Sequence, residues 1–432
     1  MVPQISPLHR PLFYRLYNMA WQAAMPLLGR NQRFADGYPQ RRLRTSPYPK
    51  SDLWIHAASV GEVYLALAII SKLQQVTSPS ILVTTNTAEG KTILTSAFET
   101  RGNDYHLRNT VNAAYFPFDA PSLMGEAIKQ IQPRAAVLLE GELWPGMMHG
   151  LKQRHIPLLV INGRLSASSF RRLKLIRSHL KAVAPNRILA ISLSDADRFA
   201  ALFGKNRVTA MPNIKFDQLL QDLPETRTSP CLPLSPGGHL VVLGSVREPE
   251  QKAVGEIISR LRGQSPEVVV ALVPRHIHRL GPWRRLLDQS GAQWMLRSRI
   301  RDDIKPGTVV LWNTVGELKA AYAQADAAFV GGSLAPLGGQ NFMEPLLAGI
   351  VPVIGTHWDK FHWVGDELAQ RGLVRIAANA EAASAALIKA LNAPVSPEKV
   401  RQEISTYMRT RQGGTHQACS LIARYLSSRR EM

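Results

Sequence analysis

Along most of the chain after residue 50, short apolar runs alternate with longer stretches whose apolar positions recur at helical spacing. The apolar runs, which are typical of buried strands, are residues 52–57, 80–85, 135–139, 157–162, 188–191 and 208–210. The stretches with helical spacing lie between them, at residues 63–75, 90–98, 122–129, 147–154 and 196–202. Such alternation predicts a parallel sheet covered by helices on both faces, over residues 51–220.

A proline-rich stretch, residues 221–239, breaks the alternation and is predicted to be an inter-domain linker. Further apolar runs follow it at residues 240–245, 267–274, 308–312, 327–333 and 351–356. We therefore expect an α/β protein with two Rossmann-like domains, 51–220 and 240–432, and an inter-domain cleft. The final helical stretch, 396–424, either closes the second domain or crosses back to the first.

Residues 1–50 form a separate basic and aromatic segment, with eight Lys or Arg residues and one acid, Asp36. The apolar part, residues 11–30, contains too many polar residues for a classical membrane-spanning helix. Two interpretations remain open. The segment is either a helix docked on the first domain or an interfacial helix on an anionic membrane leaflet, with Trp21 at headgroup level. No secretory signal peptide is expected.

The overall charge predicts an anionic partner. Lys and Arg number 52 and Asp and Glu 32, which gives a net charge of +20. Nucleic acid, an anionic lipid surface and a phosphorylated substrate all fit this charge. The chain lacks the interleaved basic and aromatic stretches of single-strand binders, which argues against nucleic acid. Its two cysteines argue against a disulfide scaffold or a zinc site.

Candidate site residues of the first domain follow predicted strands, where doubly wound sheets bind ligands. Glu62 begins the helix after the first run. It is either a glutamate that stabilises the helix start or a carboxylate, kept ionised there, that takes a proton from an incoming hydroxyl. Glu140 and Glu142 follow another strand and either serve a site or pair with Arg164 or a neighbour. Lys215 is a site residue or an ordinary surface lysine.

In the second domain, Arg275 ends a strand and is suited to a phosphate or carboxylate. The neighbouring His276 and His278 are a weak metal signal and are interpreted as polar surface residues. Glycine pairs at 331–332 and 338–339 flank a loop leading to a helix near Asn341, as phosphate-binding loops do. Glu344 is placed to accept ribose hydroxyls. The glycine pattern matches neither a dinucleotide fingerprint nor a P-loop, which argues against hydride transfer and ATP hydrolysis.

A set of ordered motifs resembles one family. These are ASVGE, EGELWP, INGRLS, NIKFD, LVPRH, VGEL, FVGGSL followed by GGQNFMEP, and PVIGTH. They resemble the lipid A 3-deoxy-D-manno-octulosonic acid (Kdo) transferases of lipopolysaccharide biosynthesis in Gram-negative bacteria. The resemblance implies a GT-B glycosyltransferase that moves Kdo from CMP-Kdo to a lipid A precursor, with inversion and without a metal or cofactor. It also implies the cytoplasmic face of the inner membrane.

The resemblance further implies roles for individual residues. Glu62 matches the general base, and Glu140 and Lys215 match residues that stabilise the transition state. The residues that match CMP contacts are Pro274, Arg275, Val315, Gly316, Glu317, Asn341, Phe342, Met343 and Glu344. Two alternatives stay open: a GT-B transferase for another nucleotide sugar, and a non-catalytic membrane- or nucleic-acid-binding protein on the same scaffold.

Overall fold

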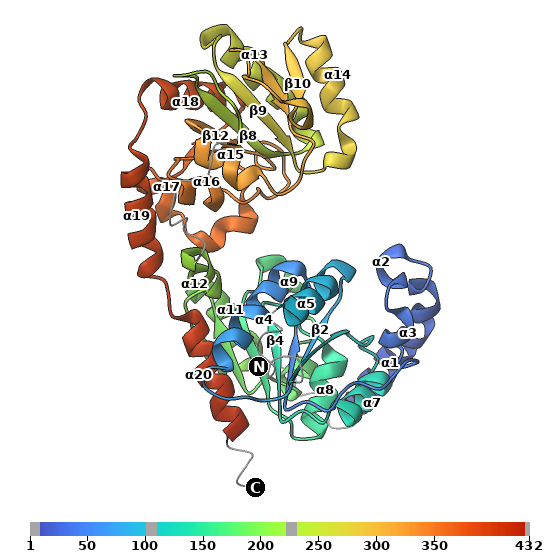
Figure 1. The fold of residues 1–432 in the computed structure, drawn as a ribbon. Coiled ribbons are helices and arrows are strands. Elements are labelled where there is room, and N and C mark those ends of the chain that lie inside the picture. The colour runs from blue at the N-terminus through green and yellow to red at the C-terminus, as the bar shows by residue number, and fades with distance from the viewer. Residues whose placement is uncertain (1–8, 101–109, 222–230, 428–432) are drawn as a thin grey trace. The chain divides into compact units, whose positions relative to one another are not determined.

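The computed structural model describes residues 9–100, 110–221 and 231–427. It divides into two compact units, Met1–Gln218 together with Arg411–Met432, and Leu219–Thr410 (Figure 1). Residues 222–230 of the predicted linker lie outside the described residues. The two units are described separately below.

The first unit is built on a parallel sheet of seven strands in the order β3-β2-β1-β4-β5-β6-β7. The strands are β1 (Leu53–His56), β2 (Ile81–Thr85), β3 (Val111–Tyr115), β4 (Ala135–Leu139), β5 (Leu158–Gly163), β6 (Arg187–Ala190) and β7 (Val208–Ala210). The helices are α1 (His9–Leu28), α2 (Gln32–Ala35), α3 (Tyr38–Arg41), α4 (Val60–Leu73), α5 (Ala88–Thr100), α7 (Pro121–Ile131), α8 (Pro145–Gln153), α9 (Ala167–Lys174), α10 (Arg177–Ala182), α11 (Leu193–Phe203), η1 (Lys205–Arg207), α12 (Ile214–Gln221) and α20 (Gly414–Ser427).

Both faces of this sheet are buried, as the unbroken apolar runs predict. Trp54 of β1 belongs to one core cluster, which includes residues of α7, α8 and α11. Leu53 and Ile55 point to the opposite face, where α4 and α20 complete a second cluster. The predicted final helical stretch, 396–424, is two helices in the structure. α19 (Pro397–Arg409) belongs to the second unit, and α20 packs on the first unit, alongside α4.

The second unit contains another parallel sheet of seven strands, in the order β10-β11-β9-β8-β12-β13-β14. The strands are β8 (Leu240–Val246), β9 (Val269–Pro274), β10 (Trp294–Leu296), β11 (Val309–Leu311), β12 (Ala327–Val330), β13 (Val353–Gly355) and β14 (Arg375–Ala377). The helices are η2 (Glu248–Glu250), α13 (Gln251–Gln264), η3 (Ile277–Arg279), α14 (Gly281–Gln289), η4 (Arg297–Arg299), α15 (Leu318–Gln324), α16 (Met343–Ala348), η5 (Asp359–Val364), α17 (Glu367–Gln370), α18 (Ala380–Asn392) and α19 (Pro397–Arg409).

Three strands, β3, β10 and β14, were not among the predicted elements. All three lie at the edge of their sheet. An edge strand has a partner on one side only. β3 and β14 contain exposed positions, and the apolar run of β10 is only three residues long, so none of the three shows the pattern of a central strand. The strands that were predicted coincide with strands of the structure to within a few residues at their ends.

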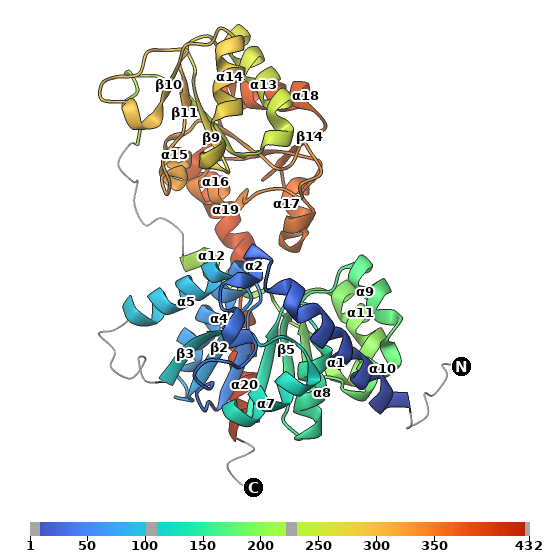
Figure 2. The same ribbon diagram turned by 90° about the vertical axis from the view of Figure 1, so that its right-hand side faces the viewer.

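The N-terminal segment contains the helix α1, which docks on the first unit (Figure 2). Tyr14 stacks on His149 of α8 with ring centroids 3.7 Å apart, and the Tyr17 hydroxyl donates to Asp119 at 2.9 Å. The opposite side of α1 carries four large apolar side chains that are between 54% and 67% exposed: Leu12, Leu16, Met19 and Leu27. None of the described helices is long and apolar enough to cross a bilayer.

Candidate active site

Glu62 lies on the first turn of α4, after the carboxyl end of β1. Ser59 is the N-cap of this helix, and its hydroxyl oxygen accepts the backbone N–H of Glu62 at 3.4 Å. In return, the Glu62 carboxylate accepts the Ser59 hydroxyl at 3.0 Å and the Ala58 N–H at 2.8 Å. This reciprocal pattern is close to a capping box, which satisfies the free donors of a helix start. Glu62 therefore helps to begin α4, whatever else it does.

Burial changes the acid strength of this carboxyl group. Glu62 is 6% exposed. Its burial raises the pKa from 4.5 to about 8, and the negative charges of Glu140 and Glu142 add to the rise. The expectation that the helix end keeps Glu62 ionised is wrong at neutral pH, because desolvation outweighs a helix-end effect of about 1 kcal/mol. A carboxyl group with this pKa is a stronger base than an ordinary glutamate.

Glu140 begins the turn after β4, the strand next to β1 in the sheet. Its backbone is left-handed, with φ of 54°, a strained conformation that clusters at functional sites. The Glu140 carboxylate accepts Lys215 Nζ at 2.6 Å, and both side chains of this ion pair are three-quarters or more buried. The turn requires Gly141, since a Cβ there would lie 2.0 Å from the carbonyl oxygen of Arg164.

Two buried asparagines place Lys215 on α12. The Asn162 side-chain oxygen, at the end of β5, accepts the Ile214 N–H at 3.0 Å. The Asn213 side-chain oxygen accepts the Lys215 N–H at 3.0 Å. Sequence analysis assigned no role to either asparagine, although both lie in the INGRLS and NIKFD motifs. They hold the start of α12 against the strand ends, so that Lys215 reaches Glu140.

The structure thus brings the three predicted residues of the first unit together. Glu140 is near enough to Glu62 for its charge to raise the pKa of Glu62, and Lys215 is paired with Glu140. The arrangement combines a buried carboxyl that titrates near neutrality with a fixed carboxylate–ammonium pair. A group of this kind can remove a proton from a hydroxyl and stabilise charge that develops beside it.

In the second unit, Arg275 directly follows the buried Pro274 at the end of β9. Its backbone N–H donates to the carbonyl of Val246 at 2.9 Å, which ties the end of β9 to that of β8. The Arg275 side chain is exposed. Arg275 therefore directly follows the end of a strand, as its place in the sequence predicted.

The turn after β11 contains Val315, Gly316 and Glu317. Val315 is 80% exposed, and Gly316 has φ of 90°, which favours glycine. The Glu317 carboxylate accepts the Trp312 indole N–H at 3.0 Å and an Arg297 N–H at 3.0 Å, and also the Thr314 hydroxyl. Glu317 therefore shapes this turn, and the exposed part of the motif is its tip.

The residues 341–344 divide into a polar and an apolar pair. The Asn341 side-chain N–H donates to the Glu344 carboxylate at 2.9 Å, and both residues are partly exposed. Phe342 and Met343 are 1% and 0% exposed. They anchor the turn in the core, which leaves Asn341 and Glu344 as the polar groups of this motif. The helix α16 begins at Met343, two residues after the predicted start.

Glu250 was missed by sequence analysis. It is 2% exposed, and its carboxylate accepts the backbone N–H groups of Gly332, Ser333 and Leu334. These residues form the glycine loop after β12. The sequence shows only that Glu250 is an acid shortly after a strand. Glu248 is another such acid, so the sequence does not distinguish the two. Glu250 holds the glycine loop in place.

His276 and His278, the weak metal signal in the sequence, are both exposed. Their ring centroids are 5.6 Å apart. Within the described residues, no group of three or more His, Cys, Asp or Glu side chains is arranged to hold a metal ion.

Comparison with known proteins identifies the family. The chain matches the family model for 3-deoxy-D-manno-octulosonic-acid transferases over residues 30–218. It is 30% identical over 406 residues to a 3-deoxy-D-manno-octulosonic acid transferase of Haemophilus influenzae, which covers 91% of this chain and 92% of the relative. A transferase of the same name from Bordetella pertussis is 27% identical over 416 residues, covering 94% of this chain and 95% of the relative.

The solved structures that are similar confirm the predicted fold class. A UDP-N-acetylglucosamine 2-epimerase matches with a TM-score of 0.55 at 14% identity, covering 82% of this chain and 91% of that one. This likeness concerns the fold alone, two parallel-sheet α/β units of the GT-B kind. Together with the relatives above, it shows that the chain is a glycosyltransferase and belongs to the family of 3-deoxy-D-manno-octulosonic acid transferases.

Proposed function

We propose that this enzyme transfers Kdo from CMP-Kdo to a lipid A precursor, with inversion at the sugar. The observation that carries the proposal is the assembly of Glu62, Glu140 and Lys215 at adjoining strand ends, in a chain of this family. The acceptor hydroxyl oxygen bonds to the anomeric carbon of Kdo, and the bond from that carbon to the CMP phosphate breaks. The acceptor proton goes to Glu62, and CMP leaves with the bonding electrons.

We assign the acceptor and the base to the first unit and the nucleotide to the second. In the first unit, the carboxylate of Glu140, held by Lys215, would stabilise positive charge on the sugar as CMP departs. In the second, Arg275 would pair with the CMP phosphate and Glu344 with a ribose hydroxyl, with the turns at 315–317 and 341–344 completing the site. The net charge of +20 suits a phosphorylated lipid acceptor and an anionic donor.

The direct test is incubation of the protein with CMP-Kdo and a tetraacylated lipid A precursor, followed by mass spectrometry of the lipid. A mass increase of one or more Kdo residues supports the proposal. A donor screen in the same assay tests the identity of the donor. Transfer of another sugar from its nucleotide, in place of Kdo from CMP-Kdo, would favour a GT-B transferase with a different donor.

We further propose that α1 lies on the cytoplasmic face of the inner membrane. Its exposed apolar side chains, Leu12, Leu16, Met19 and Leu27, form a stripe beside Arg15 and close to Arg30. The docked and the interfacial interpretations are compatible, since one side of α1 packs on the unit and the other remains exposed. Trp21, expected at headgroup level, is half-buried and packs against Phe118, and Phe13 is half-buried against His179.

Vesicle co-sedimentation tests the membrane contact. Deleting residues 1–50 is a poor test, because Met25 and Arg41 are buried in the first unit. We expect the full chain with Leu12→Ser and Leu16→Ser to bind anionic vesicles more weakly than the wild type. Each arginine near the surface adds about 1 kcal/mol, screened over about 8 Å at physiological ionic strength, so salt should weaken binding of both proteins.

The control is Leu193→Ser on α11, which removes a leucine that is 77% exposed elsewhere on the same unit. Equal binding by the double variant and the wild type would contradict the assignment of α1 to the membrane.

A further inference from the structure

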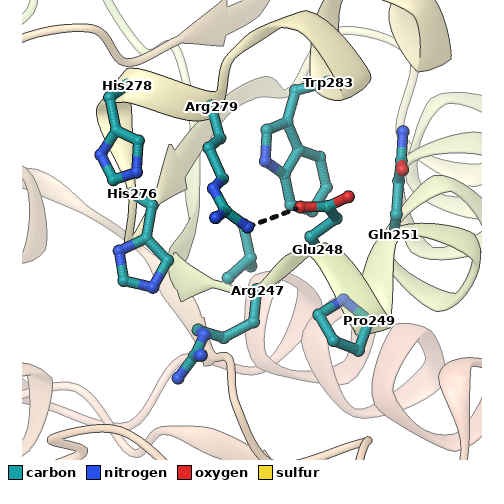
Figure 3. Close-up of a pocket in the computed structure, with 9 residues that line it drawn as sticks. Arg247, Glu248, Pro249, Gln251, His276, His278, Arg279 and Trp283 are labelled. Carbon is teal, nitrogen blue, oxygen red and sulfur yellow. Dashed lines mark ion pairs between the residues drawn. The ribbon is translucent and has the colours of Figure 1, made fainter. Parts of the chain in front are cut away.

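A pocket of about 640 Å³ opens in the second unit beside the predicted nucleotide residues. It lies between the start of η2 and α13 on one side and the η3–α14 segment on the other. Figure 3 shows His276, His278 and Arg279 on the η3 side, Glu248, Pro249 and Gln251 on the η2 side, and the indole of Trp283 as a wall. The volume is within the range of small-molecule sites.

Strand pairing places this pocket next to Arg275. β8 and β9 are adjacent and parallel, and Val246 pairs with Pro274 at their carboxyl ends. The next residues along the two strands are Arg247 and Arg275, so both arginines emerge from the same edge of the sheet. Arg247 lines the pocket. A ligand held by Arg275 would therefore border it.

The lining carries an excess of positive charge. Arg279 forms an ion pair with Glu248 at 3.6 Å. Among the described residues Arg247 takes part in no ion pair, and its backbone N–H donates to the Glu250 carboxylate at 3.2 Å. Desolvation lowers the pKa of His276, and the positive charges around it lower the pKa further; these belong to Arg247, His278, Arg275 and Arg279. An anion bound among these positive charges would reduce the repulsion between them.

We propose that this pocket binds the carboxylate-bearing sugar of the donor, with Arg247 as the main partner of the carboxylate. The inference rests on the proposed function and adds a sugar subsite to the nucleotide residues. An acidic sugar differs from a neutral one by this carboxylate, and a guanidinium is a suitable partner for a carboxylate. Arg247 is thus a residue that determines specificity for an acidic sugar donor.

Two variants with opposite expected effects test the proposal. Arg247→Ala removes the partner of the carboxylate and should raise the KM for CMP-Kdo by roughly tenfold. Glu248→Gln removes the one acid of the pocket and frees Arg279, so it should lower this KM. Arg284→Ala, an exposed arginine of α14 outside the pocket, is the control and should leave the KM unchanged. A general loss of structure would not produce effects of opposite sign.

The affinity for CMP, measured by calorimetry, separates the sugar from the nucleotide. We expect the same CMP affinity in Arg247→Ala and wild type, because CMP lacks the sugar carboxylate. A CMP affinity that falls as much as the CMP-Kdo affinity would assign the pocket to the phosphate and overturn the proposal. So would an unchanged KM for CMP-Kdo, or a raised KM for the lipid acceptor alone. If the wild type transfers no Kdo at all, the proposed function itself fails.

Discussion

Turnover by this enzyme should rise with pH through about 8, because the proposed base is buried. Protonated Glu62 cannot accept the proton of the acceptor hydroxyl, so the rate follows the ionised fraction of this carboxyl. With a pKa of about 8, that fraction is roughly one tenth at pH 7 and roughly nine tenths at pH 9. We therefore expect kcat to increase about tenfold over this interval. An ordinary glutamate, with a pKa of 4.5, would give a flat profile.

The same pKa makes stability depend on pH. The rise from 4.5 to about 8 corresponds to about 5 kcal/mol at roughly 1.4 kcal/mol per unit of pKa, an order-of-magnitude figure. Because the pKa in the folded state lies above its unfolded value, the contribution of Glu62 to stability is complete below about 4.5 and is lost as the pH rises through about 8. Glu62→Gln should remove this part of the pH dependence of unfolding.

The assay is kcat at saturating CMP-Kdo and lipid acceptor, from pH 6 to 9.5, for three proteins. Wild type should show the rise, and Glu62→Gln should be slower by roughly 10²–10⁴ with a flat profile and an unchanged affinity for CMP. Glu89→Gln, an exposed glutamate in the first turn of α5, should behave as wild type. A flat wild-type profile, or near-normal turnover by folded Glu62→Gln, would refute the assignment of the base.

Two further outcomes concern the second unit. Arg275→Ala should weaken CMP binding by roughly 1.5–3 kcal/mol, the range for a charged hydrogen bond, and Glu344→Ala should lose discrimination between CMP and dCMP. Calorimetric titrations that give unchanged affinity for both variants would exclude the predicted nucleotide site. Glu250→Gln weakens the acceptor of four backbone N–H groups, three of them in the glycine loop, and should destabilise the second unit by roughly 1–3 kcal/mol in thermal unfolding. The control is Glu256→Gln, an exposed acid of α13, and equal melting of the two variants would contradict this role.

The sequence by itself predicted most of the sheets and the motif residues. The central strands were recognisable because both faces of a parallel sheet are buried, so β1, β4 and β9 read as unbroken apolar runs. Glu140 and Arg275 could be singled out because each lies directly after such a run, and Glu62 because it lies on the first turn of the helix that follows one. The edge strands β3 and β14 could not be recognised from the sequence, because they contain exposed positions and lack an unbroken apolar run.

Only the tertiary structure decided which of these residues act together. Glu140 and Lys215 are 75 positions apart, and their ion pair depends on the hydrogen bond from α12 to Asn162 at the end of β5. The pKa of Glu62 likewise depends on burial and on Glu140, neither of which its own helix reveals. Hydrophobic periodicity is a property of neighbouring positions in the chain. The pairing and desolvation of charges depend instead on which strand ends become neighbours in space, and that order is set when the sheet forms.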